Sequence, residues 1–309
     1  MRYGISWELD SAAFNSVEDK FQALVEEARV ADSCGINSAW LTESHDDGMS
    51  VSSPAMLLTN ISQQTKSIHL GIRNRQLTHA HPVRLAEEFA TLDLFSRGRA
   101  AIAFESAAKQ GLTCGQLHET IEFILAAWSR DNIRYNGEYV KFPTSLPEDA
   151  APGLSTQPAT ETFVPQWLRN NALEDYVTVR PKPYVIRPII HVSIEEDETL
   201  EWAARNGISP IIYADVPTQE AIAQIEDYRQ ALNRAGRSLS EVEIVVEREM
   251  NIDGPESSVA LGGSVDELAC KIRHLADTTG LTHFVWKRKQ LGSEELAIFV
   301  NQIVLGIQA

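Results

Sequence analysis

The sequence has few cysteines, no long apolar run and too few basic residues to balance its acids. Its three cysteines, Cys34, Cys114 and Cys270, are far apart and form no C-x-x-C pair, which argues against a disulfide framework and predicts reduced thiols. The first ten residues, MRYGISWELD, lack the basic and apolar regions of a signal peptide. No run approaches the roughly eighteen apolar residues of a membrane span. We therefore expect a soluble protein in the cytosol.

The charge balance argues against two classes of partner. Among 309 residues, 27 are Lys or Arg and 43 are Asp or Glu, so the formal net charge is −16. A net negative charge repels phosphate backbones and anionic lipid headgroups, so we expect no nucleic-acid and no membrane partner. The length is sufficient for one large domain with a substantial core.

Short strand-like runs alternate with helical patterns along the chain, which is typical of parallel strands joined by helical crossovers. Eight such units in about 300 residues favour a closed (β/α)₈ TIM barrel over an open doubly wound sheet. No G-x-G-x-x-G or P-loop motif follows a strand. We expect one domain over 1–309. The predicted strands lie at 2–9, 36–44, 68–77, 99–106, 188–194, 209–215, 242–252 and 282–288, and the predicted helices at 17–33, 53–65, 83–94, 116–128, 198–205, 218–235, 265–278 and 294–304.

Two segments depart from this alternation. Residues 133–142, IRYNGEYVKF, have the pattern of a hairpin with Asn136 and Gly137 in its turn. Residues 143–183 contain seven of the thirteen prolines and show no period. A loop of this length before the fifth strand is either a lid or a flexible surface insertion. Three apolar residues could dock such a lid over the barrel: Phe163, Trp167 and Leu168.

Polar residues gather where the predicted strands end, and TIM-barrel active sites form at that end. His45 is a candidate for proton transfer because imidazole titrates near neutral pH; the alternative is a loop histidine facing water. The strand-end residues are Trp7, Glu8, Glu43, His45, Arg73, Asn74, Glu105, Ser106, Ser193, Glu195, Tyr213, Asp215, Glu247, Arg248, Trp286 and Lys287.

A second histidine group, His79 and His81 with His69 upstream, resembles a metal site only superficially. No carboxylate or cysteine stands nearby at ligand spacing, so we expect no metal. We interpret His81-Pro82 as the start of the following helix.

Several ordered runs together resemble the bacterial luciferase-like family of flavin-dependent monooxygenases. These runs are WLTESH (40–45), 52–72, LTHAHPVRLAEEFATLDLFSRGR (77–99), 201–212 and 262–286. The resemblance implies a (β/α)₈ barrel that oxygenates a small organic substrate with O₂. It implies reduced FMN as the cofactor, with F420 as the less expected alternative, and a separate flavin reductase as a partner. It implies His45 and Glu43 as catalytic residues. The cofactor-binding residues that it implies are Arg73, Asn74, Glu105, Ser106, Ser193 and Trp286.

The resemblance also implies a homodimer or heterodimer built on helices 53–65 and 83–94. The second of these helices is nearly all apolar on one side, through Leu85, Phe89, Leu92 and Phe95. It further implies a strained backbone at Arg73-Asn74, for example a cis peptide bond.

Three positions depart from the family pattern. Ser44 replaces the first histidine of a Glu-His-His motif, Ser106 stands where an arginine helps to hold phosphate, and 195–198 are four acids in place of hydroxyl residues. Acids near a phosphate repel it. Three hypotheses remain: a monooxygenase with a loosely held reduced flavin; a flavin-poor, non-catalytic partner subunit of a heterodimer; and a barrel that binds a small molecule without redox chemistry.

Overall fold

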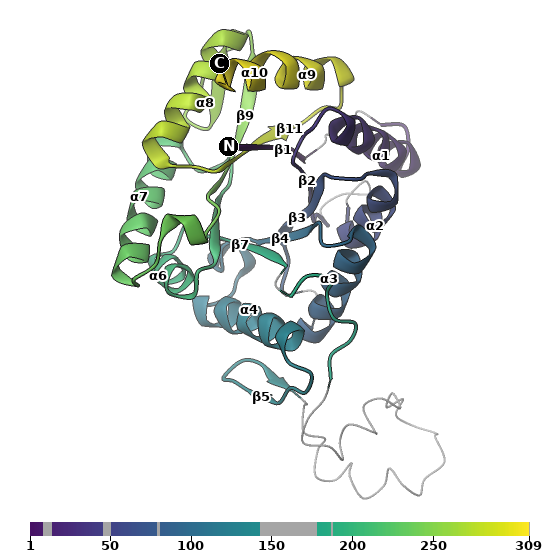
Figure 1. Ribbon diagram of the computed structural model, residues 1–309, viewed down its shortest axis with the longest axis vertical. Helices are drawn as coiled ribbons and strands as arrows, with labels where there is room; N and C mark the ends of the chain where they lie inside the picture. The colour runs from purple at the N-terminus through teal and green to yellow at the C-terminus, as the bar shows by residue number, and fades with distance from the viewer. Residues whose placement is uncertain (9–13, 46–50, 79–80, 143–177, 187, 309) are drawn as a thin grey trace, which may run out of the picture.

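The computed structural model describes residues 1–8, 14–45, 51–78, 81–142, 178–186 and 188–308 (Figure 1). Within these residues, eight parallel strands close into a barrel, because β9 pairs with both β8 and β11 and β11 pairs with β1. A ninth strand, β10 (Ala260–Gly263), extends the sheet beside β9. The predicted TIM barrel is confirmed. The barrel strands are β1 (Arg2–Trp7), β2 (Ser38–Thr42), β3 (His69–Arg75), β4 (Ala100–Phe104), β7 (Ile189–Ser193), β8 (Ser209–Ile212), β9 (Val245–Ile252) and β11 (His283–Arg288).

Helices surround the barrel as an outer ring, and the last ones return close to the N-terminus (Figure 1). None of the helices in the described residues is long and apolar enough to cross a membrane. The part of the chain that the structure describes contains the helices α1 (Val17–Ser33), α2 (Pro54–Gln64), α3 (Pro82–Ser96), α4 (Cys114–Ser129), α6 (Asp197–Asn206), α7 (Thr218–Arg234), α8 (Val265–Thr279), α9 (Ser293–Ile298) and α10 (Leu305–Gln308). A π-helical segment, Phe299–Val304, precedes α10, and short 3₁₀ turns span Ala108–Gln110 and Leu239–Glu241.

Local capping explains why α3 begins where it does. His81 is its N-cap, and the ring Nδ1 accepts a hydrogen bond from the backbone N–H of Val83 at 3.3 Å. Pro82 follows at the first helical position, where its missing N–H costs nothing. Arg97 and Gly98 then end the helix with positive φ angles of 58° and 85°. The interpretation of His81-Pro82 as a helix start is confirmed.

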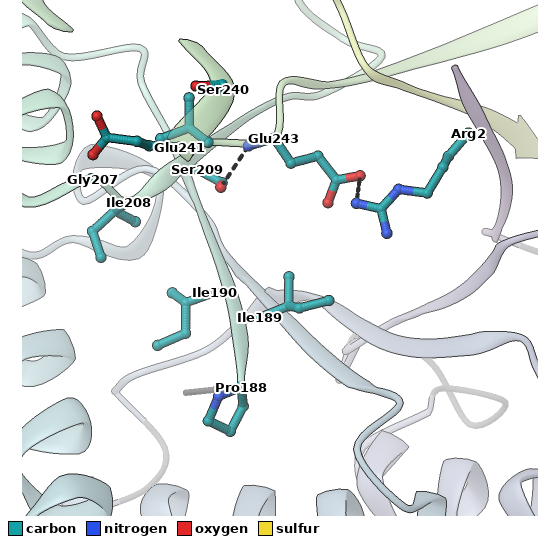
Figure 2. Close-up of a pocket in the computed structure, with 11 residues that line it drawn as sticks. Arg2, Pro188, Ile189, Ile190, Gly207, Ile208, Ser209, Ser240, Glu241 and Glu243 are labelled. Atoms are coloured by element: carbon teal, nitrogen blue, oxygen red, sulfur yellow. Dashed lines mark hydrogen bonds and ion pairs between the residues drawn. The ribbon is translucent and has the colours of Figure 1, made fainter. Parts of the chain in front are cut away.

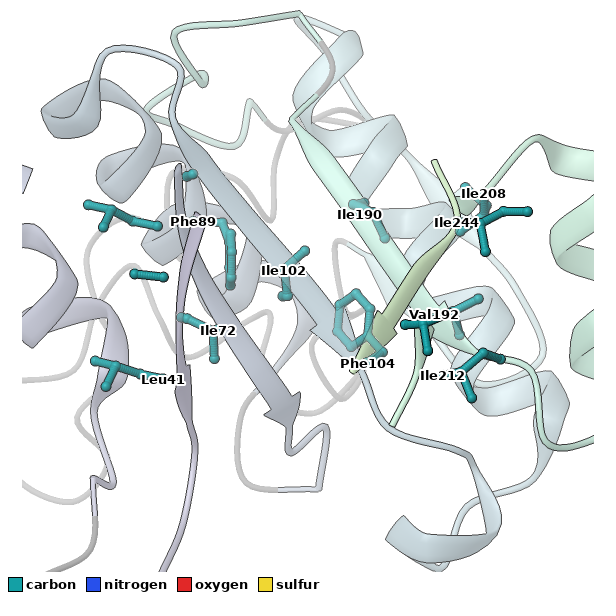
Figure 3. Packing of buried hydrophobic residues seen from close by; sticks show 14 of the residues in the cluster. Leu41, Ile72, Phe89, Ile102, Phe104, Ile190, Val192, Ile208, Ile212 and Ile244 are labelled. Carbon is teal, nitrogen blue, oxygen red and sulfur yellow. The ribbon is translucent and has the colours of Figure 1, made fainter. Parts of the chain in front are cut away.

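The main hydrophobic core lies between the outer face of the barrel and the helices (Figure 3). Alternate strand residues such as Leu41, Ile72 and Ile102 point outward and pack near Phe89 of α3. A separate, smaller cluster fills the barrel interior: Trp40, Ala101, Ala103, Ile211, Tyr213, Val245 and Val285.

The apolar side of α3 packs into this core and not against a partner subunit. Leu85, Phe89 and Leu92 are at most 1% exposed within a single chain, so we correct the prediction that they face a dimer partner. The buried stripe of an amphipathic helix covers its own barrel, because that is the nearest apolar surface. Large apolar side chains left exposed on α2 and α3 are Met56 (76%), Leu94 (40%) and Phe95 (53%).

The predicted hairpin is present as β5 (Tyr135–Asn136) and β6 (Lys141–Phe142), and it lies outside the helix ring beside α4 (Figure 1). The prediction that Asn136 lies in the turn is wrong, because this residue ends β5 and pairs with Lys141. Its turn closes through a 2.9 Å hydrogen bond from the N–H of Gly137 to the carbonyl of Val140. The predicted lid residues Phe163, Trp167 and Leu168 lie outside the described residues.

Candidate active site at the barrel mouth

The carboxyl ends of the barrel strands form a mouth lined by charged side chains. After β2, Oε1 of the buried Glu43 lies 3.0 Å from His45 Nε2, at the distance of a hydrogen bond or ion pair. The other oxygen of Glu43 is 2.6 Å from Arg75 Nη1, and Arg75 Nη2 is 2.9 Å from Glu88 on α3. Glu43 is therefore fixed by a buried guanidinium and in turn orients the half-exposed imidazole of His45. Such a carboxylate–imidazole pair can accept and return a proton.

Arg73 of β3 extends into the barrel and joins two carboxylates. Its Nη1 is 3.1 Å from Glu8 Oε2, and its Nη2 is 3.0 Å from Glu247 Oε2. Ser6 donates a 2.5 Å hydrogen bond to the other oxygen of Glu247, and Lys287 lies 2.7 Å from Glu8. Burial opposes the charge of Arg73, but the carboxylates raise its pKa, so the guanidinium stays protonated.

The end of β3 is strained beside this network. Asn74 has φ 54°, a left-handed value that is uncommon for a non-glycine residue, and the strand pairing shifts between Ile72 and Arg75. The Oδ1 atom of Asn74 is buried without a hydrogen-bond partner, and its N–H is 3.5 Å from the Tyr213 hydroxyl. The predicted strain is present, but a cis bond at Arg73-Asn74 is wrong: among the described peptide bonds, the cis bond joins Arg180 to Pro181.

Acidic side chains dominate the part of the mouth that follows β4, β7 and β8. Lys109 Nζ lies 2.8 Å from both Glu195 and Asp215, and 3.6 Å from Glu105. Although partial burial acts against the ammonium, hydrogen bonds to Asp215 and Glu195 raise the pKa of Lys109. Burial raises the pKa of the Glu105 carboxyl. One lysine thus meets three carboxylates, and the local charge is negative.

The two predicted serines take up structural contacts at this same side. Ser193 donates a hydrogen bond to Glu195 at 3.0 Å, and the hydroxyl of Ser106 accepts one from the N–H of Lys109 at 3.4 Å. Glu196 accepts a hydrogen bond from the backbone N–H of Ala108 at 3.0 Å. Acidic side chains therefore already use donors that an anion would need.

Trp286 does not reach the mouth, so we correct its prediction as a cofactor-binding residue. It belongs to the outer core, with its ring 5.2 Å from that of Phe299 and the guanidinium of Arg288 4.7 Å from its centre. Successive strand residues point to opposite faces, so Val285 fills the barrel interior while Trp286 faces the helices.

Several mouth residues were left out of the predicted site. Those noted only as strand ends are Glu8, Tyr213, Asp215, Glu247 and Lys287, and Arg75 and Lys109 were not considered. Tyr213 is fully buried inside the barrel, with the Arg73 guanidinium 4.9 Å from its ring centre, and burial raises its pKa well above 10. The two-residue period of β9 could have identified Glu247 as inward-facing, because Val245 two residues earlier fills the interior.

The model of the luciferase-like monooxygenase family matches residues 1–259, and this chain belongs to that family. The alkanal monooxygenase alpha chain of the Kryptophanaron alfredi symbiont is 24% identical over an alignment of 243 residues that covers 73% of this chain and 58% of that protein. This chain thus spans a little over half the length of that relative.

Solved structures share the fold at low sequence identity. Monooxygenase RslO1 from Streptomyces bottropensis has a TM-score of 0.77 at 18% identity, with 99% of each chain covered. The oxygenating constituent of 3,6-diketocamphane monooxygenase from Pseudomonas putida, in complex with FMN, has a TM-score of 0.69 at 17% identity, covering 99% of this chain and 96% of that chain.

The two sides of the mouth differ in how well they suit a flavin. On the β3 side, the unpartnered Oδ1 of Asn74 fits the N–H of a polar heterocycle such as isoalloxazine. On the β4–β7 side, Lys109 pairs with Glu195 and the backbone N–H of Ala108 donates to Glu196, so these residues do not fit a phosphate.

Proposed function

We propose that this protein is the oxygenase component of a flavin-dependent monooxygenase that oxygenates a small organic substrate with O₂ and reduced flavin. The observation that carries the proposal is the Glu43–His45 pair beside the strained Asn74 at the mouth of a luciferase-like barrel. We take residues 1–309 as one domain with 143–183 as its insertion, and we propose a cytosolic location.

His45 is the residue that moves a proton in this proposal. Glu43 accepts a hydrogen bond from its Nε2, which fixes the orientation of the ring. Arg75 holds Glu43 in place from the opposite side. Ser44 stands where the family has its first histidine, so His45 supplies the one imidazole that this motif retains.

The flavin ring is proposed to bind against Asn74, with Arg73 and Tyr213 closing the barrel beneath it. Reduced flavin, when bound, supplies the electrons that activate O₂. FMN is the first candidate and F420 the second; because the phosphate side is acidic, we expect the ring to contribute most of the affinity. A separate reductase would deliver the reduced flavin.

We retain dimerisation through α2 and α3 as part of the proposal, with Met56, Leu94 and Phe95 in place of the buried residues first considered. An exposed group of large apolar side chains is typical of an interaction surface. Whether the partner is a second copy or a homologous chain decides between a homodimer and a heterodimer.

Anaerobic titration with reduced FMN, followed by rapid mixing with O₂, tests the proposal. We expect binding of reduced FMN and a protein-dependent change in the rate of its reoxidation. His45→Gln should change that rate while leaving the dissociation constant for reduced FMN within about twofold, because the imidazole acts on protons and not on ring binding. His274→Gln, on the exposed side of α8, is the matched control.

A second candidate is supported by the acidic phosphate side: a flavin-poor partner subunit of a heterodimer. If FMN and riboflavin fail to bind in either redox state, and co-expression with a homologous chain yields a stable complex, this candidate replaces the first.

A further inference from the structure

One buried arginine, Arg248 of β9, has no acidic partner. Four arginines in the described part of the chain are at most 5% exposed, and three of them, Arg73, Arg75 and Arg288, each contact two carboxylates. Arg248 is the fourth; it is 0% exposed, and none of the described carboxylates forms an ion pair with it. Burial lowers the pKa of Arg248 to about 10, so the group stays charged at neutral pH. A buried charge without a partner is costly, which suits this side chain to an anion from outside the chain.

The free edge of the Arg248 guanidinium is the one that binds oxyanions. Nη1 donates to the carbonyl oxygens of Glu247 at 2.7 Å and Tyr213 at 3.2 Å, so the group is held in place. Nε and Nη2, which lie side by side on the other edge, are buried and have no hydrogen-bond partner. Two parallel N–H groups of this kind form the fork that binds phosphate or carboxylate oxygens in pairs.

The guanidinium lies close to the start of α7. The carbonyl oxygen of Tyr213 accepts hydrogen bonds from Arg248 Nη1 and from the backbone N–H of Val216, each at 3.2 Å. Helix α7 begins at Thr218, two residues after Val216. This shared acceptor therefore places the arginine beside the first turn of a 17-residue helix.

The first turn of α7 has backbone donors to spare. Its N-cap, Pro217, offers no side-chain hydrogen bond. The N–H of Thr218 donates to the carbonyl of Ser258 at 2.8 Å, whereas the N–H groups of Gln219 and Glu220 have no acceptor among the described residues. Unpaired amides and the helix dipole make such an N-terminus favourable for an anion, and phosphate groups commonly bind there.

This position is separate from the barrel interior, where the flavin ring is proposed to bind. Successive residues of β9 point to opposite faces, so Glu247 faces the interior, while Arg248 lies on the same face as Val246, which packs in the outer core. Asp215, in the loop before α7, is paired with Lys109 at 2.8 Å, so its negative charge is already compensated.

The charged residues of the cavity at the opposite end of the barrel are, by contrast, paired within the chain. This cavity has a volume of about 390 Å³ and lies at the beginnings of β1, β7 and β8 (Figure 2). Its Arg2 contacts Glu243 Oε1, which also lies 2.9 Å from His283 Nδ1, and its Glu241 is 2.9 Å from Arg237 Nη1. Arg248 is therefore the stronger candidate for binding an anion.

We propose that the Arg248 fork and the N-terminus of α7 together bind a tetrahedral oxyanion such as phosphate. The fork contributes two N–H donors, and the amides of Gln219 and Glu220 contribute two more. A tetrahedral anion directs oxygens toward both sets of donors, whereas the two oxygens of a carboxylate lie in one plane and satisfy the fork alone. Because Arg248 is closed off from solvent, the anion enters through movement of the loop 214–217.

Thermal unfolding and calorimetric titration of the full chain with inorganic phosphate test the site. At an ionic strength matched with sodium chloride, phosphate should raise the thermal midpoint, and acetate should raise it less. Arg248→Met should keep or raise the midpoint without phosphate, because it removes an unpaired buried charge. The same substitution should weaken phosphate binding at least about tenfold, as expected when a charge-assisted fork is lost.

A second variant leaves the buried arginine in place. Gln219→Glu adds a negative charge at the exposed first turn of α7 and should weaken phosphate binding by repulsion while the protein stays folded. Gln230→Glu is the matched control, since it makes the same change at an exposed position further along the same helix and should leave phosphate binding unchanged.

The phosphate of FMN is another source of the same chemistry. We expect inorganic phosphate to compete with neither FMN nor riboflavin, because Arg248 faces the helices; competition with FMN alone would support the site and assign it to the flavin phosphate. The proposal is overturned if phosphate stabilises the protein no more than chloride does. It is also overturned if Arg248→Met and Gln219→Glu both bind phosphate as tightly as the unaltered protein.

Discussion

Acidification should destabilise this barrel through one buried imidazole. His191 is fully buried on β7, its ring is 5.6 Å from that of Trp40, and neither ring nitrogen has a hydrogen-bond partner. Burial lowers the pKa of His191 from 6.5 to about 4; the charges of His283 and Arg2 act in the same direction, and Glu243 opposes them. The native state therefore holds this ring neutral, whereas the unfolded chain protonates it near pH 6.5.

The sign and magnitude follow from that difference. Because the native pKa is depressed, the contribution of His191 to stability is complete above pH 6.5 and is lost as the pH falls from 6.5 toward 4. A tenfold difference in proton affinity is worth about 1.4 kcal/mol, so lowering the pH from about 7.5 to about 5 should cost about 2 kcal/mol at this site alone. Since native domains are stable by only about 5–15 kcal/mol, that loss is measurable.

Replacing His191 with Phe isolates this effect. The substitution keeps an aromatic ring beside Trp40, removes the titrating group and breaks no hydrogen bond that the structure shows. Urea unfolding at the two pH values should show a loss of stability on acidification that is about 2 kcal/mol smaller in His191→Phe than in the unaltered protein.

His274→Gln, at an exposed position on α8, is the control and should leave the pH dependence unchanged. The reasoning is refuted if His191→Phe and the unaltered protein lose the same stability between the two pH values. It is also refuted if His191→Phe and His274→Gln reduce the loss of stability on acidification by the same amount.

Three further predictions concern the mouth and the exposed apolar surface. Glu195→Ser combined with Glu196→Ser should strengthen FMN binding and leave riboflavin binding unchanged. In the unaltered protein we expect the dissociation constants of FMN and riboflavin to lie within about tenfold of each other, or about 1.4 kcal/mol. A far larger preference for FMN in a fluorescence titration would reveal another phosphate site. Asn74→Ala should weaken both flavins equally, by about five- to tenfold for one lost hydrogen bond, and a loss confined to FMN would argue against ring binding there. Phe95→Asp should give soluble monomers, measured by light scattering, with the same thermal midpoint as the unaltered protein. Phe89→Asp should prevent folding, because it buries an unpaired charge. If the Phe95→Asp variant is still a dimer, the interface lies elsewhere.

The order of the eight barrel strands and of the helices between them was predictable from the sequence alone, whereas the extra strand β10 was not predicted. Apolar runs such as AAIAF at 100–104 recur between amphipathic helices, and each run can only be buried if a sheet is covered on its outer face. Helix starts were predictable for a similar reason, since the capping contact of His81 with Val83 spans only two residues. The family resemblance rested on the same local runs.

The chemistry of the mouth could be predicted only in part. Glu43 and His45 are two residues apart, so their pairing lies within reach of local reasoning. Trp286 was assigned to the wrong face because strand ends were counted without regard to the two-residue alternation, which places Val285 and not Trp286 inside the barrel.

Only the tertiary structure decided which residues that are remote in sequence come into contact. Lys109 meets Asp215 across 106 positions, and Ser6 meets Glu247 across 241. No local pattern specifies such a pair, because closure of the barrel brings together strand ends from all parts of the chain. The same closure buries Phe89 against the chain's own strands, and it gathers Arg2, His191 and Glu243 at the opposite end, where nothing in their local sequence distinguishes them.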